Sequence, residues 1–539
     1  MNLRTLDRVS PADARYEPPS ADRPRSLPLT AAQAALWPTA PTDTAGHLAA
    51  NTAGYLEIHG PLDPALFARA LHHTVSEAEP LRVRVLRTAG GVRQVVLPLE
   101  PLGADALGGT SAERPGRPLP ASGTATRAPK ASGRTVAAVG PAAGAARTAC
   151  AASGPRGAGH ACLRLPFRIA DLRGRRDPEA DARAWMLGDL EEPLDLAGGP
   201  LFRHALLRVG ERRWLWYQRA HHAVLDGYGH LLVARRLAEV YSALATGTEP
   251  GPTPFGPLAA LVAEDAAYRA SGLRDRDRAH WIREFADRPP APTLAGRTAP
   301  PSPAPLRHTG HLAPEATDRL RRLAASVRAT WKDAAFAAQA LHLARATRGE
   351  TVVLGLPVMG RTGSAALRVP GAAVNVLPLR LTVTPDTTFA ELTHQVVTGI
   401  RAARRHQRLR HEDIRRDLGL TGRALAGPRV NIVPLSDGPA FAGARSEPHT
   451  LASGPVDDLT VHLHDRADGT GLRIDFEANP ALYDRVGLAA HHARFLDLLT
   501  RLADSDPHRP LADLEPALAV ELDRIQRESG GGGREVRGR

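Results

Sequence analysis

Residues 219–229 read Arg219-Ala220-His221-His222-Ala223-Val224-Leu225-Asp226-Gly227-Tyr228-Gly229. The aromatic, apolar segment before them, residues 212–217, predicts a buried strand. The segment after them, residues 231–244, carries apolar residues at helical spacing and predicts a helix. The two histidines are therefore expected on a strand-to-helix turn, where a side chain can face a cavity.

An imidazole on such a turn is suited to proton transfer, because it changes its charge near neutral pH. A nearby carboxylate, here Asp226, can hold the ring in one orientation. The alternative is a buried histidine pair satisfied by backbone groups, with Asp226 capping the next helix. The pattern of two histidines, three residues, Asp226 and Gly227 between a strand and a helix favours a functional turn.

The HHxxxDG pattern resembles the signature of the condensation domains of nonribosomal peptide synthetases, which chloramphenicol acetyltransferase-like acyltransferases share. The other motif regions of the family can be placed in order along residues 27–515. These regions are Gln33, Leu36 and Trp37; Leu81 and Arg82; the stretch 193–203; Tyr268 to Phe285; Gly360-Arg361 with 371–380; 406–414; and 428–432. Their ordered spacing, more than any single motif, carries the resemblance.

The resemblance implies an α/β fold, a pseudo-dimer of two chloramphenicol acetyltransferase-like lobes. Each lobe has a mixed sheet flanked by helices, and a tunnel runs between the lobes. We expect this division: 1–26, disordered leader; 27–250, N-terminal lobe, with a disordered insertion at about 103–159; 251–310, interlobe connection with helices; 311–515, C-terminal lobe; 516–539, helix end and disordered tail. The insertion is predicted from its Ala, Gly, Pro and Ser content, which cannot bury enough apolar surface to offset ordering.

Composition narrows the functional classes. The chain has 539 residues, 43% of them hydrophobic, which suits a soluble globular protein. The net charge is +12, but the arginines are spread among acidic residues, so nucleic acid binding is not expected. The two cysteines exclude a disulfide framework, and no signal peptide or membrane-length apolar run is present. We expect a cytoplasmic monomer, free-standing because no adenylation domain or carrier-protein segment follows.

The resemblance implies an acyltransferase that forms a peptide bond. It assigns catalysis to His222 and structural roles to the rest of the motif. Asp226 would point away from the substrate and pair with Arg361 or, as second candidate, Arg82. The remaining expected site residues are His221, which orients the turn; Gly227, which permits a close backbone approach; and Asn375, at the floor of the tunnel.

The implied reaction joins a carrier-bound acyl or peptidyl thioester to an amine in secondary metabolite biosynthesis. Its partners are a donor and, where the amine is carried too, an acceptor carrier protein, each with a phosphopantetheine arm; no cofactor bound by the chain is expected. Three alternatives stay open: transfer to a free amine or alcohol, an epimerisation domain, and a non-catalytic module that recruits carrier proteins. His462 and His464 share one strand face, as metal ligands would, but lack a third ligand, so we expect sheet-surface histidines and no metal.

Overall fold

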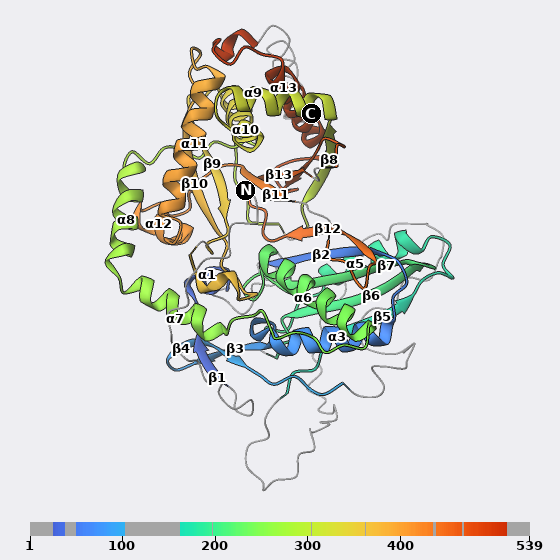
Figure 1. Ribbon diagram of the computed structural model, residues 1–539. Coiled ribbons are helices and arrows are strands. Elements are labelled where there is room, and N and C mark those ends of the chain that lie inside the picture. Colours follow the sequence, from blue (N-terminus) through green and yellow to red (C-terminus); the bar gives the residue numbers. More distant parts are fainter. Residues whose placement is uncertain are drawn as a thin grey trace, which may run out of the picture.

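The computed structural model describes residues 25–37, 50–102 and 162–514, apart from 197, 303, 362, 435–437 and 466–467. These residues form two lobes, each with a β-sheet and covering helices (Figure 1). The expected insertion at 103–159 and tail at 516–539 lie outside the described residues. So does the expected leader, except for Arg25 and Ser26, which already belong to strand β1.

The first lobe is built on a five-stranded sheet with the order β12-β2-β7-β6-β5. All neighbours in it are antiparallel except β5 and β6. Its strands are β2 (Asn51–His59), β5 (Phe167–Asp171), β6 (Phe202–Gly210), β7 (Arg213–His221) and β12 (Arg445–Ser453). A separate three-stranded sheet has the order β1-β4-β3, from β1 (Arg25–Pro28), β3 (Val83–Thr88) and β4 (Gly91–Val96).

Helices cover both faces of the five-stranded sheet. On one face, α3 and α6 share an apolar core with Trp216, and on the other face α5 packs against Tyr217. Each of these helices begins at an aspartate whose carboxylate accepts hydrogen bonds from the first turn. The helices of this lobe are α1 (Ala31–Leu36), α3 (Pro64–Glu77), α5 (Pro178–Leu190) and α6 (Gly227–Ala245). In α1, Thr30 caps the first turn and Gln33 completes a capping box.

The second lobe is built on a six-stranded mixed sheet with the order β10-β9-β11-β13-β14-β8. Its strands are β8 (Leu306–Leu312), β9 (Thr351–Val358), β10 (Asn375–Thr382), β11 (Arg429–Pro434), β13 (Leu459–Asp465) and β14 (Leu472–Ala478). Strand β8 begins at Leu306, within the stretch expected to connect the lobes. Its polar residues show no apolar alternation, so pattern alone gave no signal for a strand there.

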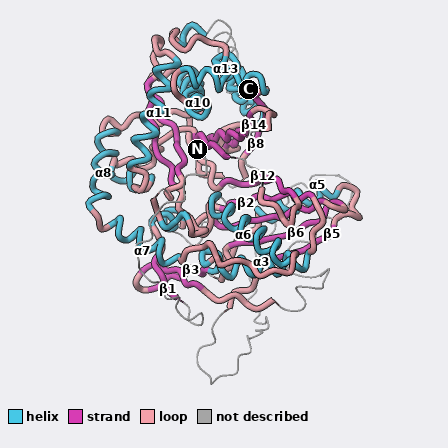
Figure 2. The backbone as a smooth tube through the Cα atoms, in the orientation of Figure 1, coloured by secondary structure: helices cyan, strands magenta, loops and turns pink. Residues whose placement is uncertain are grey.

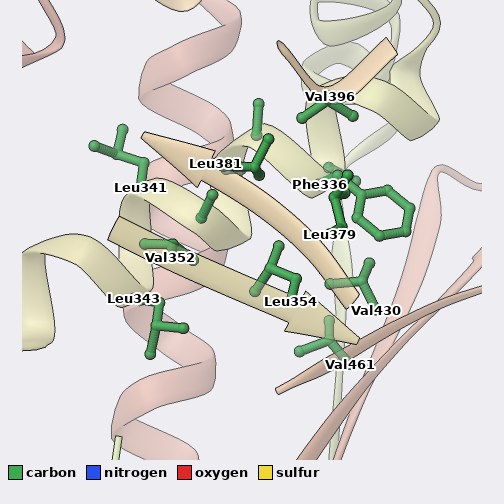
Figure 3. Packing of buried hydrophobic residues seen from close by; sticks show 14 of the residues in the cluster. Phe336, Leu341, Leu343, Val352, Leu354, Leu379, Leu381, Val396, Val430 and Val461 are labelled. Carbon is green, nitrogen blue, oxygen red and sulfur yellow. The ribbon is translucent and has the colours of Figure 1, made fainter. Parts of the chain in front are cut away.

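One face of this sheet is packed under helices, and Figure 2 shows the helices gathered there as a layer. Figure 3 shows part of the core between them, which includes the side chains of Phe336, Leu354 and Val396. The helices are α9 (Pro314–Ser326), α10 (Trp331–Thr347), α11 (Phe389–Arg405) and α13 (Arg485–Ala503). Because α10 is rich in alanine, it lies close enough to the sheet to be buried along most of its length.

Three further helices lie along the side that joins the lobes in Figure 1: α7 (Leu258–Arg269), α8 (Gly272–Glu284) and α12 (His411–Asp417). Short 3-10 turns complete the described elements: η2 (Glu79–Arg82), η3 (Ala365–Leu367) and η4 (Leu511–Leu514). Within the described part of the chain, every helix is too short or too polar to cross a bilayer.

Candidate active site

The two adjacent histidines lie on a short turn between a strand and a helix, as predicted. Strand β7 ends at His221 and helix α6 begins at Gly227. The backbone N–H of His222 donates to the carbonyl of Ala50 at 2.7 Å, and Val224 N–H donates to the carbonyl of His221 at 2.9 Å. These bonds fix the backbone of the turn at the end of the buried hairpin.

Asp226 is buried and accepts five hydrogen bonds. Arg361 donates two of them, from Nη1 to Oδ2 at 2.8 Å and from Nη2 to Oδ1 at 2.9 Å. The other three come from the backbone N–H groups of Gly229, Ala373 and Val374, at 2.9 to 3.1 Å. Asp226 therefore caps α6 and also joins the turn to a segment 135 residues or more away. Of the roles considered for Asp226 from the sequence, the helix cap and the pair with Arg361 are observed.

The guanidinium of Arg361 is fully buried and all its donors have acceptors. Besides Asp226, it donates to the carbonyls of Met359, Ala366 and Gly371, and it stacks over the ring of Tyr228 at 4.8 Å. A buried ion pair is stable only when its remaining hydrogen-bonding groups are satisfied in this way. Arg361 is therefore the partner of Asp226.

Arg82, the second candidate, points elsewhere: its Nη1 donates to the carbonyl of Leu97 at 2.6 Å. Burial by itself would raise the pKa of Asp226. The charge and hydrogen bonds of Arg361 outweigh that effect, and the pKa of Asp226 lies below its ordinary value of 3.8. The carboxylate stays ionised, and its oxygens are occupied by donors of the protein.

His221 and His222 have different surroundings. His221 is fully buried; its Nδ1 accepts from the backbone N–H of Ala223 at 3.2 Å, and its ring lies 5.7 Å from that of Trp37. His222 is half-buried, and its Nδ1 has no hydrogen-bond partner among the described residues. The ring of His222 therefore keeps an accessible part, while that of His221 packs and orients the turn as expected.

Electrostatics keep His222 neutral. Burial lowers its pKa below 6.5, Asp226 raises it, and the nearby charges of Arg410 and Arg429 lower it again. A second imidazole, His230, lies one turn into α6, with Nε2 3.0 Å from Oγ1 of Thr52. Burial lowers the pKa of His230 to about 4, so this ring is also neutral. Neutral imidazole is the form that accepts a proton.

The reason expected for Gly227 is wrong. A Cβ at Gly227 would meet no heavy atom within 4 Å, because Gly227 is exposed at the start of α6. The close approach is at Gly229, where a Cβ would lie 2.7 Å from Leu225 Cδ1 and 3.3 Å from the backbone carbon of Pro370. Helix α6 passes close to Pro370 at Gly229. This glycine lies two residues beyond Gly227, where the HHxxxDG motif ends.

Asn375 is buried at the start of β10 and connects two segments. Its Nδ2 donates to the carbonyls of Gln407 and Leu409, and its Oδ1 accepts from the backbone N–H groups of Val376 and His411. These four bonds fix the loop between α11 and α12 against the segment that contacts Asp226. The contacts of Asn375 are therefore all structural ones.

The interpretation of His462 and His464 as sheet-surface residues is wrong. Each is only 5% exposed, because the strand face that carries them turns toward β12. Their partners are Glu477 at 3.0 Å and Asp475 at 3.3 Å, on the neighbouring strand. Among the described residues no group of three or more potential ligands could hold a metal ion.

Two residues near the turn were not predicted from the sequence. His230 follows the motif by only a few residues, but its helical position gave no sign of its partners. Gly454, directly after β12, touches the ring of His222: a Cβ at Gly454 would lie 2.8 Å from His222 Cδ2. The only local signal is a Gly-Pro turn, which does not show what the turn contacts.

Several known proteins are similar to this chain in sequence and in fold. The family model of the condensation domain matches residues 160–523. The dimodular nonribosomal peptide synthase of Bacillus subtilis is 36% identical over 499 residues, which is 92% of this chain and 18% of that protein. The isonitrile lipopeptide synthase of Streptomyces coeruleorubidus is 39% identical over 497 residues, 92% of this chain and 30% of that protein. The chain thus spans less than a third of the length of these two relatives.

Solved structures agree. The starter condensation domain of rhizomide synthetase, in complex with C8-CoA and Leu-SNAC, has a TM-score of 0.72 and 34% identity, covering 90% of this chain and 96% of that one. The first condensation domain of the calcium-dependent antibiotic synthetase, with a substrate analogue, has a TM-score of 0.75 and 33% identity, covering 92% and 99%. With two lobes and an HHxxxDG turn pinned between them, the chain belongs to the condensation domains of nonribosomal peptide synthetases, acyltransferases that form amide bonds.

Proposed function

We propose that His222 is the catalytic group at which a thioester donor and an amine acceptor react. The observation that carries the proposal is the contrast within the motif. Every donor and acceptor around Asp226 and Arg361 is occupied, whereas the ring of His222 is only half-buried and is kept neutral by its lowered pKa. A fixed turn that presents one free neutral imidazole is suited to proton transfer.

In the proposed reaction the amine nitrogen attacks the thioester carbonyl carbon. The new C–N bond forms, the C–S bond breaks, and the sulfur leaves as a thiol. The proton lost by the nitrogen passes to His222 and then to the leaving sulfur, so the enzyme is unchanged at the end. Since a thioester is already activated, alignment of the two reactants and transfer of one proton supply most of what is needed.

The supporting residues have positioning roles in this proposal. Asp226 and Arg361 hold the turn from the second lobe, His221 packs beneath it, and Asn375 fixes the neighbouring segment. Gly227 begins α6 without a close contact. None of these groups is proposed to exchange a proton with the substrate.

The substrates are proposed to arrive on phosphopantetheine arms of a donor and an acceptor carrier protein, as the family resemblance implies. The chain itself would need no cofactor. We propose a monomer that works in the cytoplasm, with lobes at 27–250 and 311–515 joined through 251–310 and an insertion at 103–159 that can be deleted without loss of chemistry. Light scattering of the purified protein and deletion of 103–159 test these points.

The nature of the donor is proposed from the comparisons. One similar structure is a starter condensation domain bound to an acyl-CoA, and one similar protein is a lipopeptide synthase. Both support an acyl rather than a peptidyl donor. A panel of acyl-CoA thioesters of different chain length, together with Leu-SNAC and other aminoacyl-SNAC acceptors, therefore tests the reaction first.

The experiment measures the intact mass of products formed by the wild type and by His222→Ala. Amide formed by the wild type with at least one pair, and lost in the variant, supports the proposal. Amide formed equally by both proteins would refute the role of His222. Ester formed with alcohol acceptors in place of amide would favour transfer to a hydroxyl. No product with any pair, on small probes or on loaded carrier proteins, would favour a module that recruits carrier proteins.

A further inference from the structure

Strand β12 belongs to the second half of the chain but completes the sheet of the first lobe. It follows β11 and precedes β13, which are neighbours in the six-stranded sheet. Yet β12 itself forms eight residue pairs with β2, from Arg445 opposite His59 to Ser453 opposite Thr52, with an irregularity between Thr450 and Ala452. Figure 1 shows it between the two lobes. The chain therefore leaves the second lobe, adds an edge strand to the first, and returns.

The return takes place beside the candidate catalytic ring. Gly454 directly follows the last residue of β12 and has a φ of 98°, which side chains rarely allow. A Cβ at Gly454 would lie 2.8 Å from Cδ2 and 3.4 Å from Nε2 of His222. The backbone at Gly454 is thus packed against the Cδ2–Nε2 edge of the imidazole, and a side chain there would need the space that the ring fills.

Two arginines of the second lobe hold this segment from either side of Gly454. Arg307, on β8, donates through Nη1 to the carbonyl of Thr450 at 2.6 Å and through Nη2 to that of Leu451 at 3.4 Å. Arg429, on β11, donates to the carbonyl of Pro455 at 2.9 Å. Each arginine also has a carboxylate partner, Glu477 and Asp457 respectively.

We propose that Gly454 is a positioning residue: its bare backbone, clamped by Arg307 and Arg429, is the wall that fixes the orientation of the His222 ring. The proposal rests on the proposed function of His222. It means that the second lobe sets the geometry of an imidazole carried by the first. It also means that only a residue without a side chain fits against the Cδ2–Nε2 edge of the ring.

A turn glycine could also be present only because of its φ. The two explanations, a glycine needed for its φ and a glycine needed beside the His222 ring, differ in what a new Cβ at that position would meet. At Gly454 it meets a side-chain ring, which can swing away without unfolding the backbone, so the loss should fall on the chemistry. Gly443, two residues before β12, has a similar φ of 86° but no heavy atom within 4 Å of a Cβ. Gly443→Ala therefore carries the same backbone strain without the contact.

The test compares Gly454→Ala with Gly443→Ala in the full chain, using the donor and acceptor pair that gives most amide in the panel above. We expect kcat of Gly454→Ala to fall about 100-fold, the effect of a misplacement near 1 Å, with little change in KM. The acidic limb of the pH profile of Gly454→Ala should shift, because the His222 ring would leave the buried surroundings that lower its pKa. Both variants should melt at similar temperatures, and Gly443→Ala should keep wild-type kcat.

Crystal structures of the same variants give a readout that does not depend on turnover. The His222 ring should be displaced in Gly454→Ala and unmoved in Gly443→Ala. A ring that stays in place with the new Cβ beside it, or an unchanged kcat in Gly454→Ala, would overturn the proposal. If the wild type forms no amide at all, the proposed function fails, and the position of the ring in the two structures still decides whether Gly454 places it.

The clamp is tested by Arg307→Gln, which removes the bonds to Thr450 and Leu451 and leaves the ring and Gly454 intact. We expect a smaller fall in kcat, about tenfold, with KM unchanged. Arg473→Gln is the matched control, because Arg473 also pairs with a carboxylate on the same sheet face but has no bond to β12 among those observed. Equal effects of the two variants would contradict the clamp.

Discussion

Two of the histidine pairs in the chain differ in their surroundings. His221 and His222 are neighbours on a turn; His462 and His464 alternate along β13. In the second pair each ring faces a carboxylate on the neighbouring strand, Glu477 or Asp475, and each histidine is 5% exposed. In the first pair His221 accepts from the backbone N–H of Ala223, and His222 is half-buried. Identical side chains are therefore structural in one place and available for chemistry in the other.

The partners of the β13 pair explain its role. Asn431 lies 3.1 Å from Nδ1 of His462, and Glu477 lies 3.0 Å from its Nε2, so both nitrogens are occupied. Burial would raise the pKa of Glu477, but His462 and Arg307 together lower it to about 2. A ring held at both nitrogens completes a buried network. The ring of His222 has no ion pair with a carboxylate among those found, and this difference supports the proposal that His222 is the reactive imidazole.

The largest expected effect is that of His222→Ala. Loss of a positioned general base should lower kcat by about 100- to 10,000-fold. The melting temperature should stay close to that of the wild type, because the half-buried ring holds no observed side-chain hydrogen bond. His464→Ala is the matched control and should show the reverse, a lower melting temperature with kcat unchanged. Equal losses of kcat in His222→Ala and His464→Ala would contradict the distinction between the two pairs.

The second expected effect is on stability. Asp475→Ala removes a carboxylate that is 5% exposed and bonded to Arg473 at 2.8 Å. It should lower the free energy of unfolding by about 3 kcal/mol, because the buried His464 and the partly exposed Arg473 both lose their carboxylate partner. Asp497→Ala, which removes an exposed pair with Arg501 on α13, should cost about 0.5 kcal/mol. Urea unfolding of both variants measures the difference, and equal costs would show that the β13 network is no more stabilising than a surface pair.

The two regions should also separate in acid. The neutral form of His222 is needed for turnover, and burial places its pKa below 6.5, so kcat/KM should fall only as the pH drops through that lower value. Glu477, with its pKa lowered from 4.5 to about 2, contributes stability above pH 4.5 and loses it as the pH falls toward 2. Activity should therefore disappear while the β13 network is still folded. An acidic limb at or above pH 6.5 would contradict the burial of His222.

Local patterns predicted much of the fold and the centre of the site. The aromatic, apolar run in residues 212–217 and the helical spacing after 231 placed the histidine turn between β7 and α6. The pair of Asp226 with Arg361 came from the family resemblance, since nothing in either segment announces the other. Local patterns could not show which residues that are distant in sequence come into contact in the folded chain.

Three differences illustrate that limit. Strand β12, residues 445–453, has a proline and no apolar alternation, and it gains its partners from a sheet formed by the first half of the chain. The burial of His462 and His464 follows from strand register, which sets Asp475 opposite His462 and turns this face toward β12. The crowded glycine is Gly229 rather than Gly227, because the contact is with Pro370, which is remote in sequence.

The smallest effect is expected for His462→Gln. A glutamine amide can still donate to Glu477, so the free energy of unfolding should change by only about 1 kcal/mol, that of one hydrogen bond. Added Zn²⁺ should leave the melting temperatures of the wild type and of the variant unchanged, because both nitrogens of His462 already have partners in Asn431 and Glu477. A rise of the wild-type melting temperature with Zn²⁺ that His462→Gln abolishes would assign the pair to a metal. It would also remove the contrast with His222, since both pairs would then present a free nitrogen to a ligand.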